Sequence, residues 1–227
     1  MARFGVISAM PVEIEGIIEK FGAKEITGKG FYKLYEGSFH GHEVILACSG
    51  IGKVNAAACT QRLIDCYHVD SIINMGIAGG IEKSLKTLDV VIGSEVFYHD
   101  FTPPDLLDRY YPFTGIFKCD DRLMELAGKA CEACPEVENY YRGRVASGDC
   151  FVEAQATKDK IRASHGVCCE MEGAAIGHVC YLNGVPFLIL RSISDLADEG
   201  AKMTYDEFEK KAALQANRIV EGIIELS

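Results

Sequence analysis

The stretch Cys168-Cys-Glu-Met-Glu-Gly-Ala-Ala-Ile-Gly-His-Val-Cys180 begins like a buried strand and ends like a helix of small residues. Two acids, Glu170 and Glu172, stand where the pattern changes, and only Met171 separates them. Acidic side chains are rarely buried without a partner. The pair therefore points to a candidate site at the junction of strand and helix.

The same alternation of strand and helix runs along the whole chain. Apolar runs without polar alternation, as in 71–75 and 187–193, are typical of strands covered by helices on both faces. The predicted strands are 4–9, 31–36, 43–48, 71–75, 90–95, 144–146, 167–170 and 187–193. The predicted helices are one with Ile14, Ile17, Ile18 and Phe21 on its apolar face, then 54–67, 122–134, 157–164 and 173–182, and a last one that opens with a capping box of Thr204 and Glu207. We therefore predict an α/β fold of three layers, α/β/α, around a central, mostly parallel mixed sheet.

Length and charge limit the possible partners. The chain has 227 residues with no linker, low-complexity tract or repeat, so a single domain over 1–227 is expected. Its formal net charge is −10, whereas nucleic acid and anionic membranes bind basic faces, so neither is an expected partner. No signal peptide is visible, and no apolar run approaches the roughly 20 residues of a membrane span. A cytoplasmic protein is expected.

The 10 cysteines and 6 histidines do not form a metal motif. Cys131 and Cys134 make one CxxC pair, but a structural zinc site needs four ligands and no second pair is spaced to match. We expect both to be free core residues in a helix, without disulfides. The histidines are scattered, and His99, between Tyr98 and Asp100, is expected to be structural. No metal is therefore predicted.

Acids and glycines recur after the predicted strands, where ligands bind in sheets of this type. The segments are 8–13, 49–53, 74–80, 147–152, 170–172 and 191–195. Neither glycine-rich segment is a nucleotide-phosphate motif, because Ala47 stands where a Walker loop has its first glycine and Val54 where it has Ser or Thr. By spacing alone, these glycines fit tight turns between strand and helix equally well.

Six segments together carry a resemblance to a known family. In order they are "GVISAMPVEIE", "SGIGKVNAA", "INMGIAGG", "VASGDCFV", "CEMEGAAIGHVC" and "LRSISDLAD". They resemble the 5′-methylthioadenosine/S-adenosylhomocysteine nucleosidases of the nucleoside phosphorylase and nucleosidase superfamily, nearly end to end. The resemblance implies hydrolysis of the bond between adenine and ribose, as in methionine salvage, with no metal or organic cofactor. A homodimer is also implied.

The resemblance implies roles for the matching residues. Glu13 would be the general base that activates water, and Asp195 the general acid that protonates the adenine imidazole nitrogen not bonded to sugar. Glu172 would hold the ribose hydroxyls, since a carboxylate accepts hydrogen bonds through two oxygens. Glu170 shares its face of the extended segment and would support it. The remaining substrate-binding residues are Met10, Ile51 and Tyr205 around the 5′ group, Phe151 and Val152 around adenine, Met171 against the sugar, Arg191 near water and ribose, and also Ala78 and Gly79.

The residues alone leave simpler interpretations open. Glu13 and Glu172 also fit acids at a helix start, and Asp195 fits a turn after a strand. Two features depart from the family pattern: Ile77 replaces a common serine, and the segment 101–117 differs in length and sequence. In the family that segment helps form the 5′-substituent pocket across a two-fold interface, so Pro103, Leu106 and Leu107 are expected to complete the neighbouring subunit's pocket.

Three alternatives remain. The altered segment 101–117 keeps open a nucleosidase for another 5′-modified adenosine, such as aminodeoxyfutalosine. A phosphate-dependent purine nucleoside phosphorylase would want arginines or lysines for its phosphate, and 8–13 and 74–80 contain none. A non-catalytic nucleoside-binding protein would be expected to lose Glu13 or Asp195, and both are present.

Overall fold

The structure is a computed structural model that describes residues 1–26, 32–194 and 205–227. Its strands are β1 (Arg3–Ser8), β2 (Lys24–Glu25), β3 (Lys33–Phe39), β4 (His42–Cys48), β5 (Ser71–Gly80), β6 (Val90–Tyr98), β7 (Ile116–Lys118), β8 (Tyr140–Ser147), β9 (Gly166–Glu170) and β10 (Phe187–Ser194). Its helices are α1 (Pro11–Lys20), α2 (Lys53–Tyr67), α3 (Leu106–Arg109), α4 (Asp121–Ala133), α5 (Gln155–Ala163), α6 (Gly173–Asn183) and α7 (Tyr205–Glu225). Within these ranges, no helix is long and apolar enough to cross a membrane.

The strands form one mixed sheet whose order is β10-β6-β8-β9-β5-β1-β4-β3-β2, with β7 paired to β6. More of the aligned residue pairs are parallel (β1–β4, β1–β5, β5–β10, β6–β8, β8–β9) than antiparallel (β2–β3, β3–β4, β5–β9, β6–β7, β6–β10). Because β10 pairs with both β6 and β5, the strands β5, β10, β6, β8 and β9 close on themselves. Strands β1, β4, β3 and β2 extend outward from β5, and β7 lies beside β6.

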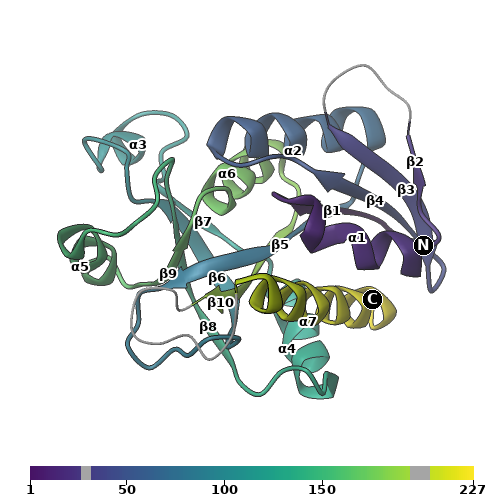
Figure 1. Ribbon diagram of the computed structural model, residues 1–227. Helices are drawn as coiled ribbons and strands as arrows, with labels where there is room; N and C mark the ends of the chain where they lie inside the picture. Colours follow the sequence, from purple (N-terminus) through teal and green to yellow (C-terminus); the bar gives the residue numbers. More distant parts are fainter. Residues whose placement is uncertain (27–31, 195–204) are drawn as a thin grey trace.

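Helices cover both faces of the sheet (Figure 1). Helices α2 and α6 pack together on one face, and α7 packs between α1 and α4 on the other. The apolar faces of these helices are buried against the sheet, for example at Ile14 and Ile17 of α1 and Leu63 of α2. The predicted three-layer fold is confirmed.

The differences from the predicted elements are local. Two short strands, β2 and β7, and the four-residue helix α3 were not predicted, because they are too short to show a period. The turn considered for 76–80 is absent, since β5 continues to Gly80 and pairs with β10 and β9 there. The turn at 50–52 is present, with Gly50 and Gly52 at φ 81° and 96°. Phe31 and the capping residue Thr204 lie outside the described residues.

The cysteines are core residues or surface thiols. All ten lie in the described ranges and are free, and Cys131 and Cys134 are buried in and after α4, as expected. Burial raises the pKa of the Cys131 thiol to about 12. Among the described residues, no cluster of three or more His, Cys, Asp or Glu side chains could hold a metal ion.

Candidate active site

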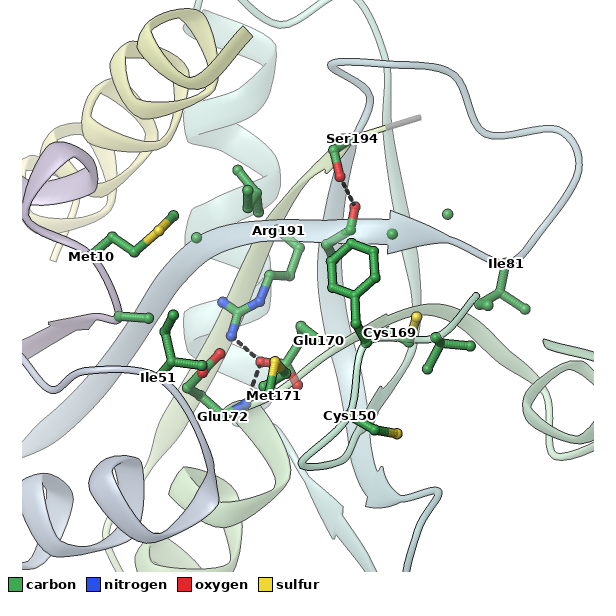
Figure 2. A pocket seen from close by; sticks show the side chains of 18 of the residues that line it. Met10, Ile51, Ile81, Cys150, Cys169, Glu170, Met171, Glu172, Arg191 and Ser194 are labelled. Carbon is green, nitrogen blue, oxygen red and sulfur yellow. Dashed lines mark hydrogen bonds and ion pairs between the residues drawn. The ribbon is translucent and has the colours of Figure 1, made fainter. Parts of the chain in front are cut away.

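A cavity of about 660 Å³ lies along the carboxyl half of β5 and at the carboxyl ends of β1, β9 and β10 (Figure 2). It is the place where sheets of this type bind ligands. The sequence-predicted residues that line it are Met10, Glu13, Ile51, Ala78, Gly79, Phe151, Val152, Met171, Glu172 and Arg191. The structure therefore brings together segments that lie as far apart as 10 and 191. Asp195 lies outside the described residues, and so does the side chain of Tyr205.

Glu13 sits in the first turn of α1 and is only 4% exposed. Its Oε2 accepts hydrogen bonds from the amides of Ala9 (3.0 Å) and Met10 (2.9 Å), so one oxygen does cap the helix. A Cβ on Gly76 would stand 2.9 Å from the other oxygen, so a larger residue there would press on this carboxylate. Burial raises the pKa of Glu13, although the Met10 amide and Arg191 oppose the shift. Glu15, two residues on, is exposed.

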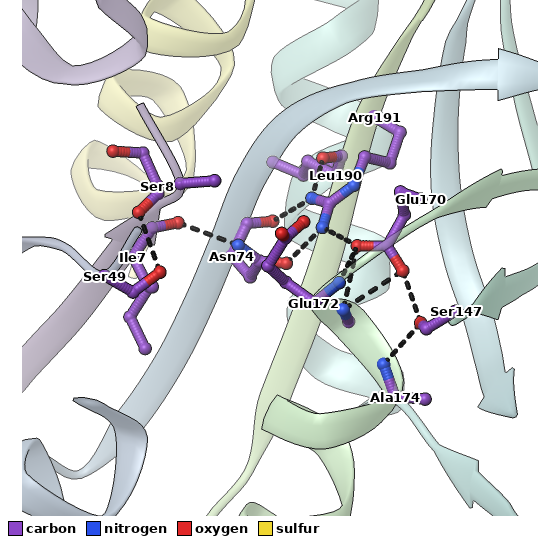
Figure 3. Close-up of polar contacts among 12 residues, drawn as sticks. Ile7, Ser8, Ser49, Asn74, Ser147, Glu170, Glu172, Ala174, Leu190 and Arg191 are labelled. Carbon is purple, nitrogen blue, oxygen red and sulfur yellow. Dashed lines mark hydrogen bonds and ion pairs between the residues drawn. The ribbon is translucent and has the colours of Figure 1, made fainter. Parts of the chain in front are cut away.

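Glu170 is the centre of a buried hydrogen-bond network (Figure 3). Its carboxylate accepts hydrogen bonds from the Ser147 hydroxyl, from the Arg191 guanidinium and from the amides of Glu172 (3.0 Å) and Gly173 (2.8 Å). The last two amides open helix α6, whose N-terminus favours a negative charge. The Ser147 hydroxyl in turn accepts from the Ala174 amide at 2.7 Å. Glu170 is thus held by donors on every side.

Glu172 is equally buried but has fewer donors. It is 7% exposed, and within the described chain its carboxylate accepts one hydrogen bond, from the Gly52 amide at 2.8 Å. Burial and the nearby charge of Glu170 raise its pKa to about 7, while the Gly52 amide and Arg191 lower it. The ionised Glu172 carboxylate has two acceptor oxygens and lines the cavity, so it can accept further hydrogen bonds besides the one from Gly52.

Arg191 is held from two sides. Its guanidinium donates to Glu170 and to the side-chain oxygen of Asn74, and also to the carbonyl of Leu190 at 2.7 Å. The Asn74 amide group donates to the carbonyl of Ile7 at 2.9 Å, which connects β10 through β5 to β1. The residue is 2% exposed, so this charge is neutralised by a buried partner.

Apolar side chains make up the rest of the wall. Figure 2 shows Met10 on one side of the cavity and Ile81 with Cys169 on the opposite side, with Met171 between them. Ile51 and Phe151 are 55% and 78% exposed at the rim. None of the described lining residues comes from 101–117. The neighbouring pocket predicted for Pro103, Leu106 and Leu107 therefore remains a proposal.

Ile77 lacks the hydroxyl of the serine that is common in the family, and Ser194 is the nearest serine in sequence to Asp195. Ile77 and Ser194 line the cavity, and the Ser194 hydroxyl donates to the Ala78 carbonyl at 3.2 Å. This hydroxyl is thus engaged with β5. A role toward Asp195 lies outside the described residues.

Several residues of the site were missed from the sequence. Asn74 and Ser147 are polar residues in or at the end of apolar strands, and that break in the pattern is the signal that marks them. The Gly52 amide carries no side-chain signal at all. Cys150 lies in the segment 147–152 that the sequence marked, but no role was assigned to it, and Lys158 lies in the predicted helix 157–164, which was not connected with the site.

A family model described as the phosphorylase superfamily matches residues 3–225. The chain belongs to the phosphorylase superfamily.

Solved structures of this superfamily match the whole chain. A Neisseria meningitidis 5′-methylthioadenosine/S-adenosylhomocysteine nucleosidase in complex with methylthio-immucillin-A is 36% identical, with a TM-score of 0.89 and 100% of both chains covered. A Colwellia psychrerythraea nucleosidase of the same name, in complex with adenine, is 34% identical, with a TM-score of 0.87 over 98% of this chain and 94% of that one. A Helicobacter pylori futalosine hydrolase is 31% identical, with a TM-score of 0.86 over 100% and 98%.

Cationic side chains are few in the cavity of this phosphorylase-superfamily member. Of the described lining residues, only Arg191 and Lys158 carry positive charge. Arg191 is already bonded to Glu170 and Asn74. Lys158 lies near the Cys169 thiol: burial raises the pKa of this thiol to about 12, and the charge of Lys158 opposes the shift. Cys169 lies across the cavity from Met10. The end of the cavity near Glu13 therefore has no free cation among these residues.

Proposed function

We propose that the protein hydrolyses the N-glycosidic bond of 5′-methylthioadenosine, S-adenosylhomocysteine or both, releasing adenine and the 5′-thio-substituted ribose. The chain is a purine nucleosidase by family and by full-length likeness to solved nucleosidases. The observation that carries the reaction is the pairing, in one cavity, of a buried Glu13 with a Glu172 that has acceptor capacity to spare. The whole chain, 1–227, would act as one nucleosidase domain.

In the proposed reaction, water is activated by Glu13. The carboxylate takes a proton from the water, whose oxygen attacks the anomeric carbon as the bond to adenine breaks. The sugar passes through an oxocarbenium-like state, as in O-glycoside hydrolysis. Burial raises the pKa of Glu13 toward the working pH, which is where a general base is most effective. Asp195 would supply the proton that adenine gains; this role rests on the resemblance.

Binding would use the rest of the cavity. Glu172 would accept hydrogen bonds from the ribose hydroxyls, with Met171 packed against the sugar and Arg191 close by. Phe151 would stack on adenine, and the backbone of Val152 would read the edge of the base. Met10 and Ile51, with Tyr205, would contact the 5′ group, whose methylenes each contribute about 0.8 kcal/mol when buried.

Water is the expected second reactant, rather than phosphate. A bound phosphate wants arginine or lysine donors, whereas the Glu13 end of the cavity offers carboxylates, and Arg191 is already paired. A carboxylate repels phosphate and suits water. This supports hydrolysis over phosphorolysis.

A second substrate class is a futalosine-type nucleoside. It is favoured by the likeness to the Helicobacter pylori futalosine hydrolase and by the unusual segment 101–117. The 5′ group would then be larger and the base and ribose contacts unchanged. We propose a cytoplasmic homodimer in either case, with Pro103, Leu106 and Leu107 at the neighbour's pocket.

The test is adenine release from a panel of adenosines that differ only at the 5′ position, measured with and without phosphate. We expect release without phosphate, fastest with a 5′-alkylthio group. A requirement for phosphate, with ribose 1-phosphate as product, would overturn hydrolysis. Preference for aminodeoxyfutalosine would overturn the assigned substrate and keep the reaction.

A further inference from the structure

Three segments meet beside the cavity, and a lysine joins them. The Lys53 ammonium, at the start of α2, lies 2.6 Å from Asp100 Oδ2, just after β6, and 3.7 Å from Asp149 Oδ2, just after β8. The side chains of Lys53 and Asp100 are each 24% exposed and that of Asp149 is 48% exposed, and the ammonium also lies 5.5 Å from the centre of the Tyr98 ring. This is more sheltered than an ordinary surface ion pair.

Backbone amides close the cluster. Asp149 accepts a hydrogen bond from the Lys53 amide at 2.8 Å, and Asp100 accepts one from the Asp149 amide at 2.8 Å. Burial alone would raise the pKa of Asp100, but the Lys53 ammonium and the Asp149 amide together hold it below its usual value. Each carboxylate is therefore tied to the backbone of another segment, and the ammonium binds both.

The residue before Lys53 connects this cluster to the active site. The amide of Gly52 is the donor that reaches Glu172. Gly52 has φ 96°, and a Cβ there would stand 3.1 Å from Asp149 Oδ1, so the turn is both tight and close to the cluster. Lys53, the residue after this turn, is held by Asp149 at its backbone amide and by Asp100 at its side chain. These contacts fix the direction of the Gly52 amide.

We propose that Lys53, Asp100 and Asp149 are positioning residues for the reaction proposed above, holding the Gly52 amide against Glu172 and so aiming the carboxylate that binds the ribose. This rests on the proposed function. Asp149 also immediately precedes Cys150 and Phe151 of the cavity wall, and Asp100 immediately precedes the segment 101–117. The cluster therefore links the ribose contact to the segments proposed for the base and the 5′ group.

The first test compares Lys53→Met and Asp100→Asn with the matched changes Lys118→Met and Asp121→Asn. The Lys118–Asp121 pair has a similar separation, 2.8 Å, but is exposed (63% and 72%) and does not line the cavity. Lys53→Met and Asp100→Asn should lower kcat/KM for 5′-methylthioadenosine about tenfold, because small misplacements of binding groups are costly. The same two variants should lower kcat/KM for the 2′-deoxy analogue much less. The control variants Lys118→Met and Asp121→Asn should leave kcat/KM unchanged for both substrates.

A pH profile separates positioning from general damage. The groups that act on Glu172 are Glu170, Arg191, Glu13 and the Gly52 amide. The Gly52 amide lowers the pKa of Glu172, so losing it raises that pKa and leaves less of the ionised form. The acid limb of kcat/KM for the riboside should therefore move to higher pH in Lys53→Met and Asp100→Asn. A merely structural cluster would lower the profile without moving the limb.

The same variants give a readout that does not need turnover. The chemical shift of the Glu172 carboxyl carbon can be followed by NMR as a function of pH in the free protein, and Glu172→Gln assigns the signal. Lys53→Met should raise the pH midpoint of this titration. A raised midpoint without nucleosidase activity in the unaltered protein would support the contact and overturn the proposed function. An unmoved midpoint, or equal losses for riboside and 2′-deoxy analogue, would overturn the positioning role.

Discussion

Glu170 and Glu172 are two residues apart and equally buried, at 8% and 7% exposure, yet their surroundings differ. Glu170 accepts hydrogen bonds from four groups, including a buried arginine and the first amides of α6. Glu172 accepts one, within the described chain, and burial together with Glu170 raises its pKa to about 7. Burial alone therefore does not distinguish an acid whose acceptor capacity is used from the acid proposed to bind the ribose. The number of donors already engaged does.

The largest expected effect lies at a third acid, Glu13, and at the proposed general acid, Asp195. Glu13→Gln and Asp195→Asn should each lower kcat by about 10²–10⁴, the usual size of a general acid–base contribution. Glu15→Gln is the matched control, since Glu15 is exposed on the same helix, and its turnover should be unchanged. Similar losses at Glu13 and Glu15 in a steady-state assay would mean that helix α1, and not the Glu13 carboxylate, is what matters.

The comparison of the two glutamates predicts opposite effects on stability. Glu170→Gln leaves Arg191 buried without its counter-charge and should lower the free energy of unfolding by about 3 kcal/mol or more. Glu172→Gln removes a charge that is itself disfavoured by burial and by Glu170, so it should be neutral or stabilising. Urea unfolding of the unaltered protein and of both variants measures these free energies of unfolding. Equal losses would show that the two acids are not distinguished by their donors.

The pH dependence of stability sharpens this contrast. The pKa of Glu172 is raised from 4.5 to about 7 in the folded protein, so the folded state holds a proton that the unfolded state has lost. The free energy of unfolding should therefore fall as pH rises from 4.5 to about 7, by about 3 kcal/mol at most from this group. Glu172→Gln should flatten that part of the curve. A curve of unchanged slope would contradict the raised pKa.

The smallest effect is expected at the segment 101–117. Leu106→Asp should raise KM for 5′-methylthioadenosine more than KM for adenosine, because Leu106 is proposed to contact only the 5′ group of the neighbouring subunit's substrate. Sedimentation of the unaltered protein and of the same variant shows whether the proposed dimer forms and whether it persists. If both substrates suffered equally in an intact dimer, the 5′ pocket would have to be built from other residues.

Much of the fold could be predicted from local patterns. The apolar strands and the periodic helices are strong signals, whereas β7 and α3 are too short to show one. The extension of β5 through Gly80 was not visible, because glycines are read as turns and only pairing with β9 and β10 makes them strand. Partners distant in sequence decide that element.

The site was predictable in part, for a similar reason. Motif matches located ten of the residues that line the cavity. Sequence could not say that Glu170 is saturated while Glu172 is not, because the deciding donors come from other elements: Ser147 at the end of β8, Arg191 within β10, and Gly52 before α2. The Gly52 contact is made by a backbone amide, which leaves no trace in residue type.

The measurement that tests the central claim most directly is the preference for ribose over 2′-deoxyribose in Glu172→Ala. Initial rates of adenine release are compared for 5′-methylthioadenosine and its 2′-deoxy analogue, in this variant and in the unaltered protein. We expect kcat/KM for the riboside to fall steeply while that for the 2′-deoxy analogue changes little, so that the preference is largely lost. An unchanged ratio between the two substrates would contradict the role of Glu172 in holding the ribose hydroxyls.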